Sequence, residues 1–97
     1  MKAVVLLEAK KPKLREIKDL VLDRPDWIKI AVKAVGLCGS DMQKINSETD
    51  PGSYLKTGVL GHEFAGEVLE VGSKVKGLQV GNRVTANPMV PCGSCLP

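Results

Sequence analysis

The sequence predicts a mainly β fold, a barrel or sandwich built from short strands with short helical segments. Apolar and polar residues alternate within short stretches, as they do in strands with one buried face. Turn-forming residues separate these stretches, with ten glycines and six prolines among 97 residues. Many short strands joined by frequent turns are typical of β-barrels and sandwiches.

The predicted strands follow one another along the whole chain. Four segments are rich in apolar or β-branched residues and fit the alternation: 2–7, 27–35, 63–71 and 83–86. A fifth segment, 14–22, fits either a short helix or a strand. Prolines at 12 and 25 leave room for only a short element there, and we favour a strand.

One stretch in the middle of the chain departs from the strand pattern. Ser40 and Asp41 are residue types that cap helices, and they precede the sequence MQKI, so a capped helical turn is predicted at 40–45. The following residues, 46–54, have the composition of a loop.

Size and composition indicate a single domain, residues 1–97, and exclude several function classes. The chain is 43% apolar and 26% charged, with a net charge of +3, which is typical of a globular protein. Only 3% of the residues are aromatic, too few for a base-stacking surface, so we expect no nucleic-acid partner. The basic run at 10–15 is bracketed by acidic residues and is interpreted as solvated surface.

The cysteines and the missing motifs add further limits. No apolar stretch approaches the roughly 18 residues that cross a bilayer, so we expect no membrane contact. Three cysteines, two of them in a C-x-x-C pair, do not make a disulfide framework and favour the cytoplasm. Neither a G-x-G fingerprint nor a phosphate loop occurs, so any nucleotide-binding domain lies outside these residues.

Two segments carry residues that could do chemistry. Cys38, Ser40 and Asp41 lie within four positions, and His62 and Glu63 lie at the entrance to a predicted strand. Each segment alone has an ordinary structural explanation: a buried cysteine, a helix cap, a hydrogen-bonded histidine. Together they offer a thiolate and an imidazole from separate elements, which is how open catalytic zinc sites are assembled.

The third candidate is the pair Cys92 and Cys95. A C-x-x-C spacing suits two thiolates on one tetrahedral metal, or a thioredoxin-like redox pair. The flanking prolines do not suit the redox setting, so we favour metal, of which this pair would be half a structural site.

In order along the chain, the motifs GLCGSD, GHEFAGEV, GNRV and PCGSC resemble the zinc-dependent medium-chain alcohol and polyol dehydrogenases, including sorbitol and galactitol-1-phosphate dehydrogenases. The resemblance implies a GroES-like, partly open β-barrel that stops before a Rossmann domain. It implies hydride transfer from a polyol or secondary alcohol to NAD, with zinc polarising the alcohol oxygen. It also implies a homodimer or homotetramer, and no activity for these 97 residues alone.

The same resemblance assigns roles to individual residues. It implies that Cys38 and His62 ligate the catalytic zinc and that Glu63 is an alternating or water-bridged ligand. Ser40 would take the substrate proton, and Asp41 would orient the zinc-bound imidazole. Cys92 and Cys95 would be the first two thiolates of a structural zinc.

Three positions depart from the pattern of simple alcohol dehydrogenases. Gly39 stands where those enzymes often have a basic residue, which favours polyol substrates; Gln43 replaces a histidine that often ends the proton path, and Asn82 replaces a turn aspartate. The alternatives are a non-catalytic barrel or zinc-binding module, a zinc-free reductase of the same superfamily, and the thioredoxin-like interpretation. The zinc-type residues argue against the zinc-free reductase.

Overall fold

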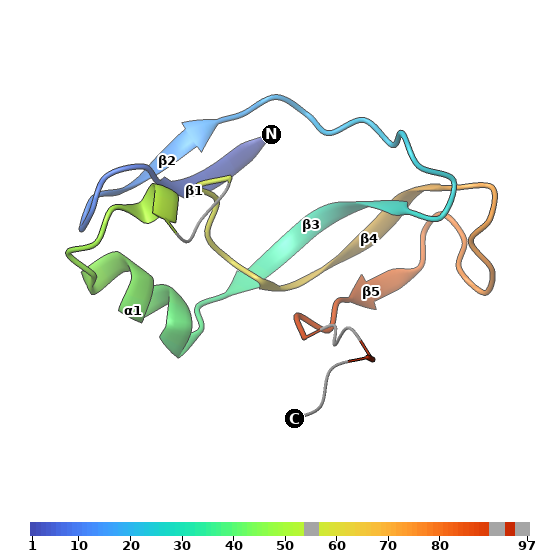
Figure 1. Ribbon diagram of the computed structural model, residues 1–97. Helices are drawn as coiled ribbons and strands as arrows, with labels where there is room; N and C mark the ends of the chain where they lie inside the picture. Colours follow the sequence, from blue (N-terminus) through green and yellow to red (C-terminus); the bar gives the residue numbers. More distant parts are fainter. Residues whose placement is uncertain (54–56, 90–92, 95–97) are drawn as a thin grey trace.

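Two small antiparallel sheets and one helix make up the fold of the computed structural model, which describes residues 1–53, 57–89 and 93–94 (Figure 1). One sheet pairs β1 (Lys2–Leu6) with β2 (Pro12–Glu16), and the other has the order β3 (Ile28–Gly36), β4 (Glu63–Val71), β5 (Arg83–Thr85). The helix α1 (Gly39–Asn46) follows β3, and a 3-10 turn, η1 (Pro51–Ser53), follows α1. The predicted mainly β fold is confirmed.

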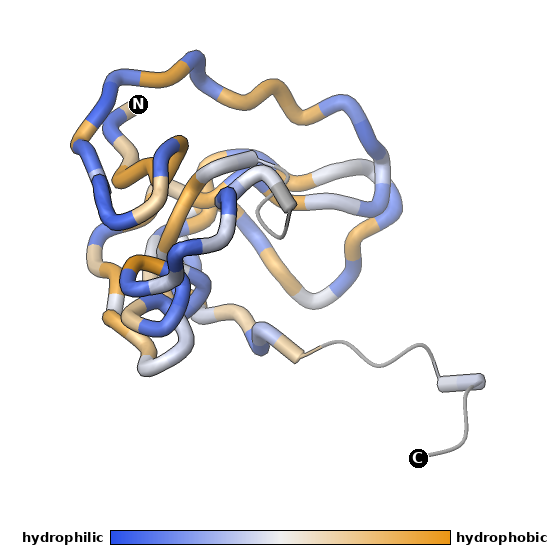
Figure 2. Tube along the Cα trace, turned by 60° about the vertical axis from the view of Figure 1, so that its left-hand side comes forward, coloured by the Kyte–Doolittle hydropathy of each residue, from blue (hydrophilic) through white to orange (hydrophobic). Residues whose placement is uncertain are grey.

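The strands predicted at 2–7, 27–35, 63–71 and 83–86 are all present within one residue of their predicted bounds. The strand predicted at 14–22 is wrong beyond Glu16, and residues 17–27 form an extended strap between the sheets (Figure 1). Pairing with β1 ends there: Lys2 pairs with Glu16, and the last hydrogen bonds are exchanged between the backbone groups of Met1 and Ile17. Hydrophilic and hydrophobic residues alternate along this strap (Figure 2).

The helix begins earlier than the sequence predicts. Cys38 is the N-cap residue, so Ser40 and Asp41 lie inside the first turn rather than at its cap. Cys38 takes the cap position because the carboxylate of Asp41 accepts a hydrogen bond from the Cys38 backbone N–H at 3.1 Å. The predicted loop at 46–54 is also corrected in part, because η1 interrupts it.

A short bridging segment joins the two sheets. Val5 and Val59 form an isolated antiparallel bridge, and Leu6 donates its N–H to the Gly58 carbonyl at 2.7 Å. In the described part of the chain the buried apolar residues are Ala3, Val5, Leu6, Leu60 and Val68. The small core therefore lies between β1, the 58–60 segment and β4.

The β3–β4 ladder contains two irregularities on opposite strands. Lys29 pairs with Glu70 but Ile30 pairs with Val68, so Leu69 is an extra residue on β4. Further along, Val32 pairs with Gly66 and Ala34 with Ala65, which leaves Lys33 as an extra residue on β3. Two such bulges bend and twist the ladder while restoring its original register.

The basic run is solvated surface, as predicted. Lys11 pairs with Glu8 at 2.7 Å, and Lys10 pairs with Glu48 at 2.8 Å. The hydrogen bond and charge of Lys11 lower the pKa of the Glu8 carboxyl, with smaller contributions from Lys13 and Arg15. Among the residues described, no helix has the length and apolar content needed to span a membrane.

Gly66 offers a test of the close packing of β3 against β4. A Cβ at this position would meet the Ala31 carbonyl oxygen, a backbone atom that cannot rotate away, and would lie 2.6 Å from the Ile30 side chain. We expect Gly66→Ala to lower the free energy of unfolding by about 3 kcal/mol, because the strands must separate. Urea titration measures the change.

The control is Gly77→Ala, a site with a φ of 79° and no atom within 4 Å of a new Cβ. It should cost only the strain of the left-handed backbone, about 1 kcal/mol. Equal losses at the two glycines would contradict the packing explanation.

Candidate metal centre

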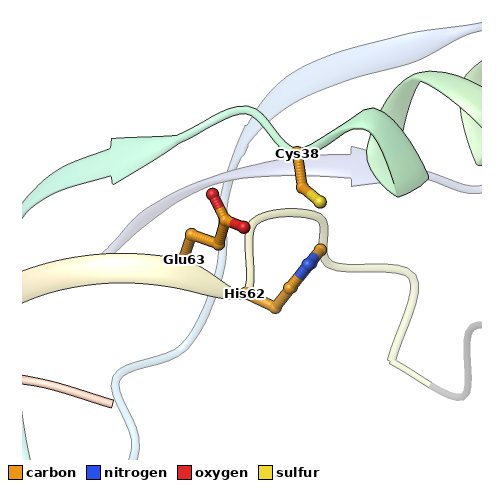
Figure 3. Close-up of side chains that lie close together, drawn as sticks. All are labelled: Cys38, His62 and Glu63. Carbon is orange, nitrogen blue, oxygen red and sulfur yellow. The ribbon is translucent and has the colours of Figure 1, made fainter. Parts of the chain in front are cut away.

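Three side chains converge at the end of the β3–β4 ladder (Figure 3). The sulfur of Cys38, a ring nitrogen of His62 and a carboxylate oxygen of Glu63 all lie within 4.8 Å of one another. Cys38 stands between β3 and α1, while His62 and Glu63 stand at the start of β4. The structure therefore brings together the three residues that the resemblance implied for the catalytic zinc.

Strand pairing explains why these three side chains lie close together. The last rung of the ladder joins Gly36 to Glu63, so Cys38, two residues beyond the rung, faces the residues just before β4. Gly61, next to His62, has a φ of 94°, a conformation that L side chains rarely adopt. A Cβ on Gly61 would also lie 2.6 Å from Val35 Cγ1. This glycine lets the chain turn so that His62 enters the site.

Asp41 connects two of these residues. Its Oδ2 accepts the N–H of Cys38, and its Oδ1 lies 3.3 Å from Nδ1 of His62. The Asp41 side chain is wholly buried, yet Oδ1 has no hydrogen-bond partner, since it and Nδ1 are close but not aligned. A small rotation of the imidazole would align Nδ1–H with Oδ1 and satisfy the carboxylate, which is the arrangement by which a carboxylate orients a metal-binding histidine.

Ser40 lies on the other side of the imidazole. Its Oγ is 3.4 Å from Nε2 of His62, at the long limit of a hydrogen bond, and the contact is partly buried. The hydroxyl thus stands beside the nitrogen that the Asp41 contact leaves free, within the first turn of α1.

The donor set suits zinc. Thiolate sulfur, imidazole nitrogen and carboxylate oxygen are all zinc ligands, and zinc accepts them in mixed tetrahedral sets. The buried, unpartnered Oδ1 of Asp41 on the far side of the imidazole also fits, because a carboxylate there fixes the ring of a metal-binding histidine.

The remaining predicted metal residues, Cys92 and Cys95, lie outside the described residues.

A groove of about 520 Å³ runs beside Glu63. Its walls are the end of β3, the start of β4 and the segment after β5, with the lining residues Ala34, Val35, Gly36, Glu63, Phe64, Ala65, Thr85, Ala86 and Pro88. The sequence does not predict this groove, because most of its lining is small and apolar and forms no motif. Ala34, Ala65 and Thr85 pair across three adjacent strands there, a register that the sequence does not reveal.

The fold and the cluster agree with a family match. Residues 24–97 match the family model described as the alcohol dehydrogenase GroES-like domain. The chain therefore belongs to this family.

Individual members of the family show which dehydrogenases this chain is similar to. The chain is 45% identical to the sorbitol dehydrogenase of Bacillus subtilis over 87 residues, covering 84% of this chain and 24% of that protein. It is 39% identical to an uncharacterized zinc-type alcohol dehydrogenase-like protein of Escherichia coli, covering 79% of this chain and 23% of that protein.

Among solved structures, galactitol-1-phosphate dehydrogenase from Escherichia coli superimposes with a TM-score of 0.80 at 31% identity, covering 98% of this chain and 27% of that one. The expected GroES-like fold is confirmed. The chain spans about a quarter of the length of these relatives, which are named as alcohol or polyol dehydrogenases.

Asp41 provides a test of how the imidazole is oriented. In Asp41→Asn the remaining oxygen can still accept the Cys38 N–H, but the amide then presents an N–H to His62 Nδ1. That favours the proton on Nε2 and blocks the nitrogen a metal needs. Zinc affinity, measured by chelator competition, should fall about 10-fold to 100-fold.

The matched control is Asp23→Asn, the same change at an exposed carboxylate, which should leave zinc affinity unchanged. Wild-type affinity in Asp41→Asn would show that the carboxylate does not act through the imidazole.

Proposed function

We propose that this chain carries the catalytic zinc ligands of an NAD-dependent dehydrogenase that oxidises a polyol or another secondary alcohol. The observation that carries the proposal is the convergence of Cys38, His62 and Glu63 within 4.8 Å, with the buried Asp41 beside the imidazole. Family membership and the names of the relatives support the reaction class.

The substrate class is proposed from two features. Relatives in the family include sorbitol and galactitol-1-phosphate dehydrogenases. Gly39, directly after Cys38, leaves this position without a basic side chain, as in the polyol branch that the sequence resembles. The groove beside Glu63 offers an open approach for a small alcohol.

The chain's own residues then have distinct tasks. Cys38, His62 and Glu63 would hold the zinc ion, which lowers the pKa of a bound hydroxyl. The Ser40 hydroxyl would relay the proton released by the substrate, accepting it while its own O–H proton passes outward, since its Oγ lies beside the His62 ring. Asp41 would hold the ring with its proton on Nδ1 and keep Nε2 available.

The proposal extends to parts that the structure does not describe. Cys92 and Cys95 would be two thiolates of a separate structural zinc. NAD would bind to a part of the protein outside these residues, so the 97 residues alone would be inactive. The whole protein is proposed to be cytoplasmic and to form a homodimer or homotetramer.

The direct test is to purify the protein as its source encodes it, measure zinc per chain, and assay oxidation of sorbitol, galactitol 1-phosphate and 2,3-butanediol with NAD or NADP. We expect bound zinc and NAD-dependent oxidation of at least one polyol. Cys38→Ser should lose one zinc ion per chain, the catalytic one, together with the activity. A protein that retains no zinc and oxidises none of these alcohols would instead favour a non-catalytic barrel.

Ser40 is tested separately from metal binding. Ser40→Ala removes the hydroxyl beside Nε2 but none of the proposed ligands. The zinc content should stay unchanged while kcat falls about 10²-fold to 10⁴-fold, which is the usual contribution of a positioned acid or base to the rate. Ser40→Thr, which restores a hydroxyl, should recover much of the rate, and undiminished kcat in Ser40→Ala would exclude the proton-accepting role.

A further inference from the structure

A glycine pairs with Glu63, which is the one proposed metal ligand that lies in a strand. Gly36 pairs with Glu63 in the last rung of the β3–β4 ladder. A Cβ built on Gly36 would lie 3.4 Å from Glu63 Oε2 and 3.6 Å from both the Cβ and the carbonyl oxygen of Glu63. The glutamate side chain therefore lies along the surface that a side chain at position 36 would occupy.

The bulge at Lys33 decides which residue faces Glu63. If pairing continued from Val32 and Gly66 without the extra residue, Val35 would stand opposite Glu63. A one-residue shift would also turn the later side chains of β3 to the other face of the sheet. With Lys33 left out of the ladder, Gly36 takes the position and Val35 pairs with Phe64.

We infer that Gly36, placed by the bulge at Lys33, is a positioning residue for the metal centre: it leaves open the space in which the Glu63 carboxylate reaches Cys38 and His62. Gly36 touches no proposed substrate atom and acts only through Glu63. The inference rests on the proposed function, since it assumes that the cluster binds a metal ion.

The size of the side chain at position 36 gives the test. Alanine should be tolerated, because a Cβ at 3.4 Å is in ordinary van der Waals contact and Gly36 has no positive φ. Valine adds two branches beyond that Cβ with little rotational freedom, so it should displace the Glu63 carboxylate. Valine is also a favourable strand residue, which separates this effect from loss of the strand.

The experiment measures zinc affinity by chelator competition, and the absorption spectrum of the cobalt-substituted site, in the protein as its source encodes it. Gly36→Val should weaken zinc about 10-fold to 100-fold and change the cobalt spectrum, whereas Gly36→Ala should match the unsubstituted protein. Ala31→Val is the matched control, because Ala31 is a small residue paired with another glutamate, Glu67, away from the cluster. It should leave both readouts unchanged.

A double substitution asks whether Gly36 acts through Glu63. Glu63→Ala should weaken zinc binding by about as much as Gly36→Val does. The zinc affinity of the combined variant should lie within about twofold of that of Glu63→Ala. Additive losses in the combined variant would overturn the inference. Thermal unfolding without metal checks that Gly36→Val remains folded, and Gly36→Ser, with one atom beyond Cβ, takes its place if it does not.

The two proposals fail in different ways. One outcome is that Gly36→Val matches the unsubstituted protein in zinc affinity and cobalt spectrum. That result would overturn the role of Gly36 and leave the proposed function intact. If the unsubstituted protein takes up no zinc at Cys38 and His62, the proposed function fails, and the role of Gly36 fails with it.

Discussion

The buried carboxylate of Asp41 is the constraint on which the candidate site depends. One oxygen of Asp41 closes the first turn of α1 through the Cys38 N–H, and the other faces the ring of His62. A buried carboxylate is costly unless its oxygens are satisfied, so an imidazole that rotates to donate its Nδ1–H to Oδ1 would tie the histidine to the helix start. The residue that holds the start of the helix would therefore also set the distance between a thiol and an imidazole that are far apart in sequence.

The β3–β4 ladder supplies the other half of this arrangement. β4 is the central strand of its sheet, and its first residue, Glu63, is held by pairing with Gly36. Side chains at the ends of paired strands are better fixed than side chains on loops, which matters for a site that needs three atoms within a few ångströms. The helix and the ladder thus approach the cluster from two directions, and Cys38 is the residue at which they meet.

Local patterns in the sequence explain most of the strands. Alternation over 63–71 reflects one buried face, so that strand can be detected without knowing its partner. The strand at 28–36 is indicated by its β-branched residues, although its alternation does not correspond to an alternation in burial. The end of β2 could not be predicted in this way, because it depends on where β1 stops pairing. The cap at Cys38 was missed because serine and aspartate are the favoured cap residues, and the competing hydrogen bond comes from Asp41 inside the helix.

The candidate site was predicted by a different kind of reasoning. Residue types and spacing supported only a general thiolate and imidazole pair, and the resemblance of the motifs added Glu63 and the role of Asp41. Neither could show the bulge at Lys33 or the positive φ of Gly61, which arise from pairing between distant segments and from backbone geometry. We expect these two features to set how closely the three candidate ligands approach one another.

The position of the cluster links metal binding to folding. In the described part of the chain few apolar side chains are buried, and large ones such as Leu20, Val21 and Leu37 are exposed. A metal ion bound by Cys38, His62 and Glu63 would join the end of β3 to the start of β4 in the folded state only. Such a ligand at a thousandfold excess over its Kd contributes about 4 kcal/mol to stability. The geometry that suits the proposed chemistry would then also stabilise the sheet that creates it.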